Sequence, residues 1–322
     1  MASNSPTVFI ATRGSALALA QSNHVQAHFR AAFPGEQFEL KIIKTTGDKL
    51  QTASLASSDL PKGLFTKELE VAMLEGQADL AVHSLKDLPT DLPAGLTLGA
   101  VSVREDVRDV MIWREELAAH APKSGESLLA LLPQGATVAT SSTRRGAQLL
   151  DHRPDLKIVP IRGNVGTRLR KISEQKEWHA TVLAAAGLKR LGYRLEDNGA
   201  LHGSDVPAGL RAAPLSPEEM LPCVGQAAIG IENRANDPRI ARIIASFDHA
   251  ETHTCVLAER AFLRAMGGGC HLAVAALGRV TGDNIHLRAV SFLAGKPRRA
   301  EGTAPVREAE KLGEELARQV RD

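Results

Sequence analysis

The strongest constraint on the fold is a strand–helix alternation that occurs twice along the chain. Short runs of apolar and β-branched residues predict strands, and apolar residues at spacings of three and four predict helices. Because parallel strands are joined through covering helices, such an alternation predicts a parallel sheet with helices packed on it. The first set of expected elements is, in chain order, strand 7–11, helix 16–29, strand 38–44, helix 64–74 and strand 79–82.

The alternation restarts after a polar stretch at residues 104–109. Two α/β units in tandem predict two similar lobes with a cleft between them. The second set of expected elements is strand 136–139, helix 141–150, strand 157–161, a helix beginning at 166–173 and strand 181–185.

The last part of the chain predicts a third, α+β domain. The Gly- and Pro-rich stretch 198–217 is expected to be a surface loop, and regular structure resumes at 221–232. The predicted fold class is therefore α/β, with two lobes and a small α+β C-terminal domain. Its expected elements are a helix at 252–266, ended by three glycines, strand-like runs at 271–280 and 284–293, and a helix at 304–320.

Composition narrows the possible functions. Aromatic residues make up only 3% of the 322 residues, and the pI is about 8.5. Nucleic-acid binders usually stack bases on aromatic side chains or carry long basic arms, so nucleic acid is not an expected partner. No stretch approaches the roughly 18 uncharged apolar residues of a membrane span.

The N-terminus and the cysteines indicate a reducing compartment. The first residues lack a basic region before their apolar run, which argues against a signal peptide. Cys223, Cys255 and Cys270 are odd in number and far apart, which argues against a disulfide framework and favours a cytoplasmic location. No CxxC spacing occurs, and no metal site is expected.

Positive charge is concentrated in the middle of the chain. Residues 144–176 contain nine Lys or Arg against three acids, a local excess of +6 where the whole chain has +2. Two segments dominate this region, TSSTRRG at 140–146 and IRGNVGTRLRK at 161–171. Ser, Thr, Gly and Asn beside the cations start helices and leave backbone N–H groups for anions. The region is expected to hold a group with several negative charges.

The first segment places cations where a helix dipole disfavours them. Residues 141–143 stand where a strand becomes a helix, the usual ligand position in open α/β sheets. Arg144 and Arg145 would lie in the first helical turn, where cations are unfavourable. A bound polyanion would explain them, and a solvated helix start with surface arginines remains the alternative.

The second segment repeats this pattern. Gly163 and Gly166 permit a tight turn between Arg162 and Arg168, whose planar guanidinium groups match carboxylates or phosphates. The GxxxxGK[ST] pattern of a P-loop is absent. Together with Arg13 after the first strand, the two segments form a constellation rather than one isolated loop.

Two further residues could carry chemistry. Asp87, beside Lys86 after a strand, is a candidate acid–base or cation-stabilising carboxylate, although on local evidence an ordinary turn at the strand end is the favoured interpretation. Cys270 follows three glycines and could be a nucleophile, an attachment point or a buried small hydrophobe. His83, Cys223 and Cys255 are interpreted as structural.

Segments spread over most of the chain are similar to one known family. They occur in the family's order and resemble hydroxymethylbilane synthase, also called porphobilinogen deaminase. The matching segments are ATRGSALAL (11–19), KGLFTKELEVAMLEGQADLAVHSLKDLPT (62–90), ATSSTRRGAQL (139–149), DLKIVPIRGNVGTRL (155–169), AAAGLKRLG (184–192), LPCVGQAAIGIE (221–232) and AERAFLRAMGGGCHLAVAA (258–276).

The resemblance implies a fold and a reaction. It implies two lobes like type II periplasmic-binding-protein domains, comprising residues 1–103 with 221–245 and residues 104–220, and a cofactor-attachment domain at 246–322. It also implies a transferase that deaminates four porphobilinogen molecules and joins them head to tail into hydroxymethylbilane. A dipyrromethane cofactor, attached by a thioether to Cys270, primes the chain. A monomer is expected.

The resemblance also implies roles for individual residues. Asp87 matches the catalytic aspartate, which would stabilise positive charge near the pyrrole N–H when ammonia leaves. The other matching residues are Lys86, Ser84, Thr140, Ser142, Arg144 and Arg145 for the cofactor, Arg13, Ser15, Arg162, Arg168, Arg190 and Gln226 for the substrate, and Lys62 in the active-site loop.

The chain departs from the family in places. Many bacterial members have two lysines four residues apart in the loop before residue 63, whereas this chain has Ser58 and Lys62. The segments 118–126 and 198–217 resemble surface insertions. A non-enzymatic binding protein for a small polyanion would share the two-lobed architecture, but it would need neither Asp87 nor Cys270.

Overall fold

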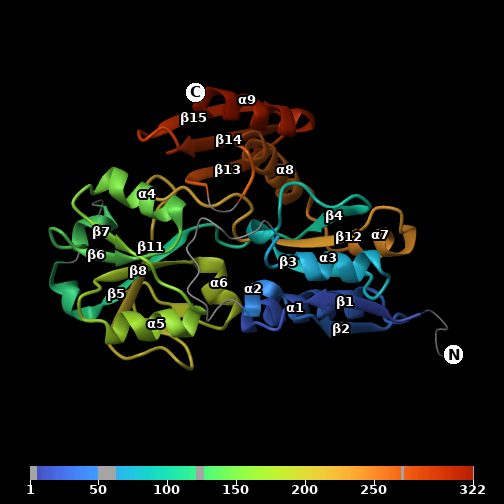
Figure 1. Cartoon of the computed structure of the whole chain (residues 1–322), viewed down its shortest axis with the longest axis horizontal. Coiled ribbons are helices and arrows are strands. Elements are labelled where there is room, and N and C mark those ends of the chain that lie inside the picture. Colours follow the sequence, from blue (N-terminus) through green and yellow to red (C-terminus); the bar gives the residue numbers. More distant parts are fainter. Residues whose placement is uncertain (1–5, 50–62, 121–126, 270–271, 322) are drawn as a thin grey trace.

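The computed structural model describes residues 6–49, 63–120, 127–269 and 272–321. Figure 1 shows two α/β lobes side by side, with a smaller body above them that contains the C-terminal end. The first lobe, in blue and cyan, lies on the right, and the second, in green, lies on the left. Within these ranges, no helix is long and apolar enough to cross a membrane.

The first lobe is built on a five-stranded sheet. Its first three strands in sheet order are parallel, and the fourth runs antiparallel to both of its neighbours. That fourth strand comes from a distant part of the chain, so this lobe is discontinuous in sequence. The sheet order is β2 (Phe38–Ile42), β1 (Val8–Thr12), β3 (Leu80–Ser84), β12 (Ile229–Arg234) and β4 (Leu96–Val101).

The sheet of the second lobe has the same arrangement. Its three parallel strands come from the second α/β run, and its antiparallel fourth strand arrives directly from the first lobe. Each sheet therefore contains one antiparallel strand, β12 in the first and β5 in the second, that follows a segment crossing from the other lobe. Type II periplasmic-binding proteins have the same arrangement. The sheet order is β7 (Lys157–Val159), β6 (Thr137–Ala139), β8 (Ala180–Ala184), β5 (Asp109–Arg114) and β11 (Leu210–Pro214).

Helices cover both sheets, and side-chain caps fix where several of them begin. Ser15, Ser142 and Asn164 each accept a hydrogen bond from a backbone N–H in the first turn of the helix that follows. These caps place three helix starts beside the carboxyl ends of parallel strands. The helices of the lobes are α1 (Ala16–Ala32), α2 (Thr46–Lys49), α3 (Lys67–Leu74), α4 (Thr143–His152), α5 (Val165–Glu174), α6 (Ala185–Arg190) and α7 (Pro238–Ile244).

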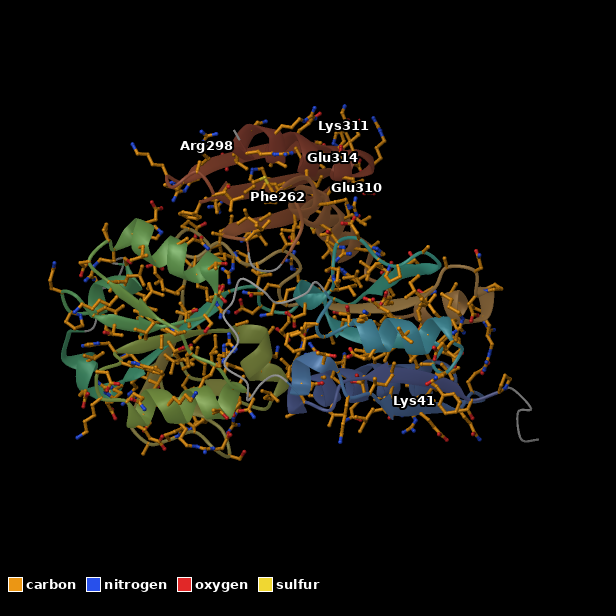
Figure 2. The ribbon with its side chains drawn as sticks, in the orientation of Figure 1. Lys41, Phe262, Arg298, Glu310, Lys311 and Glu314 are labelled. Carbon is orange, nitrogen blue, oxygen red and sulfur yellow. The ribbon has the colours of Figure 1, made fainter. Side chains whose placement is uncertain are left out.

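The C-terminal body packs two helices against an antiparallel sheet of three strands. Phe262 lies at the centre of its apolar core, whereas Glu310, Lys311 and Glu314 project outward (Figure 2). The sheet follows the chain order β13 (Val274–Thr281), β14 (Asn284–Ser291) and β15 (Arg298–Pro305), and the helices are α8 (Ala250–Ala265) and α9 (Ala309–Arg321).

Two expectations about the C-terminal half are wrong. The stretch 198–217 is not only a surface loop, because β11 lies in it and pairs with β5 in the second sheet. It also holds β10 (Leu201–His202), which pairs with β9 (Arg194–Leu195). The helix expected at 304–320 begins only at Ala309, because β15 extends to Pro305 and a short 3-10 helix, Val306–Glu308, follows it. Of the expected insertion at 118–126, residues 121–126 lie outside the described ranges.

Candidate functional site

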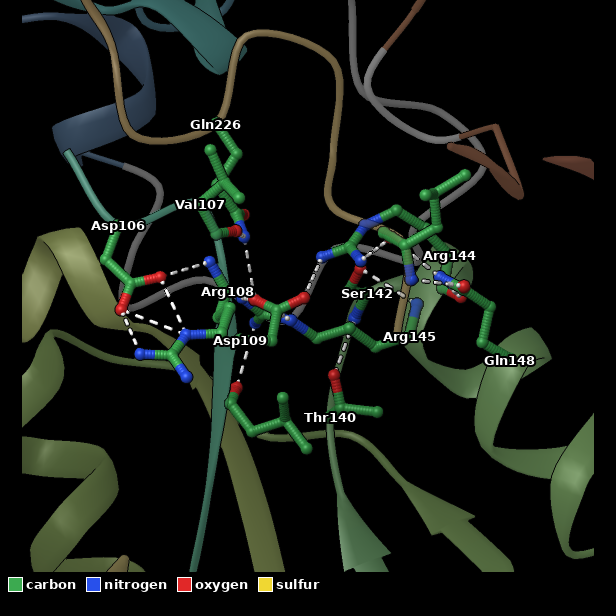
Figure 3. A network of polar contacts seen from close by, with 12 residues as sticks. Asp106, Val107, Arg108, Asp109, Thr140, Ser142, Arg144, Arg145, Gln148 and Gln226 are labelled. Atoms are coloured by element: carbon green, nitrogen blue, oxygen red, sulfur yellow. Dashed lines mark hydrogen bonds and ion pairs between the residues drawn. The ribbon is translucent and has the colours of Figure 1, made fainter. Parts of the chain in front are cut away.

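A buried carboxylate organises the region between the lobes (Figure 3). One oxygen of Asp109 accepts from Arg144 at 2.7 Å, and the other accepts from Arg145 at 2.6 and 3.2 Å. Gln226 donates its side-chain N–H to the second oxygen at 3.0 Å. Asp109 and Gln226 are completely buried, and the two arginines are nearly so. The charges of this cluster therefore interact with little screening by water.

Asp109 explains why two cations stand at the start of α4. Their unfavourable position at a helix N-terminus is offset by the carboxylate, which β5 places beside that turn. Burial by itself would raise the pKa of Asp109, but the two guanidinium groups hold that pKa well below its ordinary range. One carboxylate between two guanidinium groups leaves one formal positive charge, so the cluster still favours an anion.

The remaining donors of the two arginines are mostly engaged by the backbone. Arg144 donates to the carbonyl of Leu221, and Arg145 donates to that of Val182. Within the described ranges, Nε of Arg144 has no hydrogen-bond partner although it is buried. The Oε1 atom of Gln226 is in the same condition. Thus one buried donor and one buried acceptor of the cluster have no partner among the described residues.

The cap of α4 contains the other two residues that the resemblance placed with these arginines. The Ser142 hydroxyl accepts from the backbone N–H of Arg145 at 3.4 Å, and the Thr140 hydroxyl accepts from the backbone N–H of Ser142 at 3.2 Å. Both hydroxyl groups therefore order the strand-to-helix turn. Their contact with a cofactor stays a prediction.

A second group of expected residues surrounds a small cavity in the first lobe. Arg13, Ser15, Ser84 and Asp87 all contribute to its lining. Asp87 is exposed at the end of a short 3-10 helix (Leu85–Asp87) that follows β3. The structure thus brings the candidate catalytic carboxylate together with three of the residues expected to bind ligand.

The polar partners of these residues fix their positions. Arg13 forms an ion pair with Asp48 at 2.5 Å, and its guanidinium group lies 4.2 Å from the centre of the Phe65 ring. Ser15 caps α1, and Ser84 donates to the side-chain oxygen of Gln21 at 3.0 Å. Arg13 therefore reaches the cavity with its charge already partly compensated.

Three further expected cations make no ion pair within the described part of the chain: Lys86, Arg168 and Arg190. Arg168 donates to the carbonyl of Gly163, and Arg190 donates to that of Ala227. Burial lowers the pKa of all three side chains. The nearby charge of Arg145 lowers the pKa of Arg168 further. Partly buried cations that form no ion pair gain most from an anionic ligand.

Electrostatic proximity connects the two lobes at this site. The ammonium of Lys86, from the first lobe, interacts with Asp87 beside it and with Arg145 and Asp109 of the second lobe. The half-buried thiol of Cys223 lies in the same field, although burial raises its pKa. Lys86 and Asp87, adjacent in the chain, therefore form one site with the arginine cluster around Asp109.

Not every expected residue falls within this group. Arg190 lines a larger cavity between α1 and the end of α6, and Gln21 is the residue that lines both that cavity and the one beside Asp87. Arg162 is exposed. Cys270 and Lys62, as well as Ser58, lie outside the described residues.

Sequence reasoning missed Asp109, Asp48 and Gln21. Asp109 was seen only as the end of a polar stretch, and its neighbours in the site lie 35 and 36 positions away along the chain. The available signal was the pair of adjacent arginines at a helix start, which required a buried acid or an anion nearby. Cys223, interpreted as structural, also lies beside Lys86.

The fold and the site define a class of protein. Two lobes of type II periplasmic-binding-protein topology enclose a junction rich in cations, and a third body is joined to them. Comparison with known proteins identifies the family within this class. The family description "Porphobilinogen deaminase, dipyromethane cofactor binding domain" matches residues 8–242, and "Porphobilinogen deaminase, C-terminal domain" matches residues 253–322.

Curated relatives agree over nearly the full length. The porphobilinogen deaminase of Desulforudis audaxviator is 47% identical, over 96% of this chain and 93% of the relative. That of Geobacter sulfurreducens is 44% identical, over 97% of this chain and 90% of the relative. The chain belongs to the porphobilinogen deaminase family.

Asp109→Asn should destabilise the second lobe. Removing one partner of a buried charge cluster typically costs about 3–5 kcal/mol. Because the folded-state pKa of Asp109 is depressed, its contribution is complete above the unfolded pKa of about 3.9 and is lost as pH falls through the folded value. The substitution should therefore also reduce the acid-induced loss of stability below about pH 4.

Urea unfolding followed by tryptophan fluorescence measures this effect, since Trp113 and Trp178, the two tryptophans of the chain, both lie in the second lobe. Asp155→Asn is the matched control, because Asp155 pairs with Arg153 near the surface of the same lobe. Equal losses from the two substitutions would contradict the central role of Asp109.

Proposed function

We propose that this protein is a hydroxymethylbilane synthase. It deaminates four porphobilinogen molecules and joins them head to tail into a linear tetrapyrrole, with release of ammonia. A dipyrromethane cofactor attached through a thioether to Cys270 primes the reaction. The observation that carries this proposal is a group of cations, without ion pairs among the described residues, beside an exposed Asp87 in a chain of this family.

The residues at the lobe junction suit a dipyrromethane. Each of its two rings bears an acetate and a propionate, so the group carries several carboxylates and two pyrrole N–H donors. Lys86 and the net positive Asp109 cluster supply cations for the carboxylates. Nε of Arg144, which has no partner among the described residues, can donate to a cofactor carboxylate, and Oε1 of Gln226, which also has none there, can accept from the pyrrole N–H of a substrate ring.

Asp87 supplies the negative charge that the chemistry needs. When ammonia leaves the aminomethyl group of porphobilinogen, positive charge develops on the pyrrole ring and its nitrogen. A carboxylate held beside that nitrogen stabilises the charge as it forms. Lys86 is adjacent to Asp87 in the chain, so it can neutralise a substrate or cofactor carboxylate close to the reacting ring. Asp87 is accordingly assigned the catalytic role.

The remaining expected residues divide between cofactor and substrate. Ser84, Thr140 and Ser142 order the strand ends on which the cofactor-binding cations lie. Arg13, Ser15, Arg162, Arg168, Arg190 and Gln226 are assigned to substrate carboxylates and ring nitrogens, and Lys62 to the active-site loop.

The domain assignment follows the two crossings between lobes. Residues 1–103 with 221–245 form the first lobe, 104–220 the second, and 246–322 the cofactor-attachment domain. The two family matches, to 8–242 and 253–322, divide near the start of the third. A cytoplasmic monomer whose substrate is porphobilinogen, with no nucleic-acid partner, completes the proposal.

Intact-mass measurement tests the cofactor assignment. The purified chain should exceed its sequence mass by one dipyrromethane, and Cys270→Ala should abolish that excess together with turnover. Cys255→Ala, which alters a thiol buried in the C-terminal core, should retain the added mass. A fully active chain with no added mass would refute the assignment.

Asp87→Asn should retain the fold and the bound cofactor yet lower kcat by about 100- to 1000-fold, since removing one group that stabilises transition-state charge has an effect of this size. Formation of hydroxymethylbilane from porphobilinogen measures the loss. Asp91→Asn, which alters an exposed carboxylate four residues further on, should leave kcat within a factor of about two. Near-normal activity of Asp87→Asn would contradict its catalytic role.

Arg168→Leu should raise KM for porphobilinogen by about tenfold or more, because a charge-assisted hydrogen bond contributes about 1.5–3 kcal/mol. Stability should stay the same or rise, because burial of a cation without an ion pair is relieved. Arg170→Leu, on the exposed side of the same helix, is the control. Equal KM values for the two variants would exclude Arg168 from anion binding.

A further inference from the structure

Arg260 makes a set of contacts that the proposed reaction leaves unexplained. It lies on α8 and is only 5% exposed. Its guanidinium group donates to the carbonyls of Leu88 at 3.1 Å, Pro89 at 2.6 Å and Thr90 at 3.3 Å. These three carbonyls follow Asp87 directly in the chain. One side chain from the C-terminal body therefore spans the segment that follows the catalytic carboxylate.

That segment has little other support for its backbone. It belongs to no helix or strand, and Pro89 has no N–H to donate. Among the described residues, no backbone N–H donates to the carbonyls of residues 88–90. Helix α8 also supports this segment by apolar packing, because its Val256 lies in one hydrophobic cluster with Leu85 and Leu88. The conformation after Asp87 thus depends on α8.

The arrangement carries an energetic cost. Arg260 makes no ion pair within the described ranges, and burial together with Arg264 lowers its pKa to about 10. Only the more distant charges of Glu232 and Asp91 favour its protonated form. An apolar side chain of similar length would fill the space without burying a charge. The value of the guanidinium lies in its planar set of donors, which can hold several carbonyls at once.

The same segment touches the chain just before the proposed attachment residue. Helix α8 ends at Ala265, and the backbone of Gly268 lies against Thr90. A β-carbon placed on Gly268 would come within 3.2 Å of the Thr90 hydroxyl oxygen, and Gly268 has a φ of +65°. Cys270 follows two positions later in the sequence. Residues 88–90 therefore lie between Asp87 and the glycines that follow α8.

We propose that Arg260 is a positioning residue that fixes Asp87 relative to the end of α8, and so to the anchored end of the growing chain. This inference rests on the proposed function. Each addition needs the carboxylate beside the reacting ring while the attachment stays in place. A displacement of about 1 Å in such a geometry can lower the rate about 100-fold.

The test uses the full-length holoenzyme with Arg260→Lys and Arg260→Met. Lysine keeps the charge but offers one donor centre in place of a planar group, and methionine removes the charge while filling similar space. Arg264→Met is the matched control, since Arg264 lies one turn further along α8, is more exposed, and contacts the segment through Thr90 at 3.4 Å and Asp91, with Glu310 as a further partner.

Three readouts are measured for each variant: bound dipyrromethane by intact mass, kcat and KM for porphobilinogen, and amide hydrogen exchange of peptides covering 84–92 and 264–269. Both Arg260 variants should keep the cofactor and a KM within about threefold of the wild type, while kcat falls about 10- to 100-fold. Exchange should rise in both peptides. Arg264→Met should resemble the wild type in all three.

Unchanged exchange in 84–92, or faster exchange with an unchanged kcat, overturns the proposal. If Arg260→Met does not fold, Arg260→Lys decides, because it retains length and charge. A rise in KM without a fall in kcat also overturns it, since that pattern indicates lost substrate binding. A wild-type chain that lacks dipyrromethane contradicts the proposed function instead, and the exchange readout then still reports whether Arg260 orders residues 84–92.

Discussion

The structure depends most on the buried carboxylate of Asp109. It is the first residue of the strand that enters the second lobe from the first, and its backbone carbonyl accepts from Leu215 at the point where the chain begins to return. Its side chain holds Arg144, Arg145 and Gln226. One residue therefore ties both crossing segments to the start of α4. Loss of this charge would release the site and the lobe junction together.

The same set of contacts continues into the C-terminal body. Gln226 accepts, through its backbone carbonyl, from Nε of Arg104, which pairs with the fully buried Glu259 of α8 at 2.6 Å. Glu259 also accepts from the backbone N–H groups of Gly225 and Gly278. Burial by itself would lower the pKa of Arg104, but the carboxylate of Glu259 raises that pKa above its ordinary value. Lobe 2, the crossings and α8 are thus linked by buried charges, whose geometry is more restricted than that of surface ion pairs.

Sequence patterns predicted the parts of the fold that local periodicity determines. The parallel strands and covering helices of both lobes, and α8 with its glycine end, occur close to where they were expected. β11 was missed because its surroundings are rich in Gly and Pro, and it is a strand only through pairing with β5. β15 was missed because Arg298, Arg299 and Glu301 give it no apolar face that a pattern could detect.

The site was predictable in kind but not in its pairing. Adjacent arginines at a helix start indicated an anion, and the structure supplies one from the protein itself in Asp109. The sequence could not show which cations lack a carboxylate partner inside the protein. Asp109 and Asp48 are distant from their arginines in the sequence, and only the fold brings them together. The resemblance grouped all the arginines as ligand-binding, whereas the structure divides them by partner.

That division separates the roles of cations that look alike in sequence. Arg144 and Arg145 share an internal carboxylate, so they contribute a net charge and a fixed shape. Lys86 and Arg168 form no ion pair among the described residues and remain partly accessible, which is why both are proposed to bind a ligand carboxylate. Arg260 also lacks a carboxylate, but it is buried and its donors are directed at three carbonyls. Accessibility and partner, more than charge alone, therefore distinguish a cation that binds ligand from one that positions the residues that do.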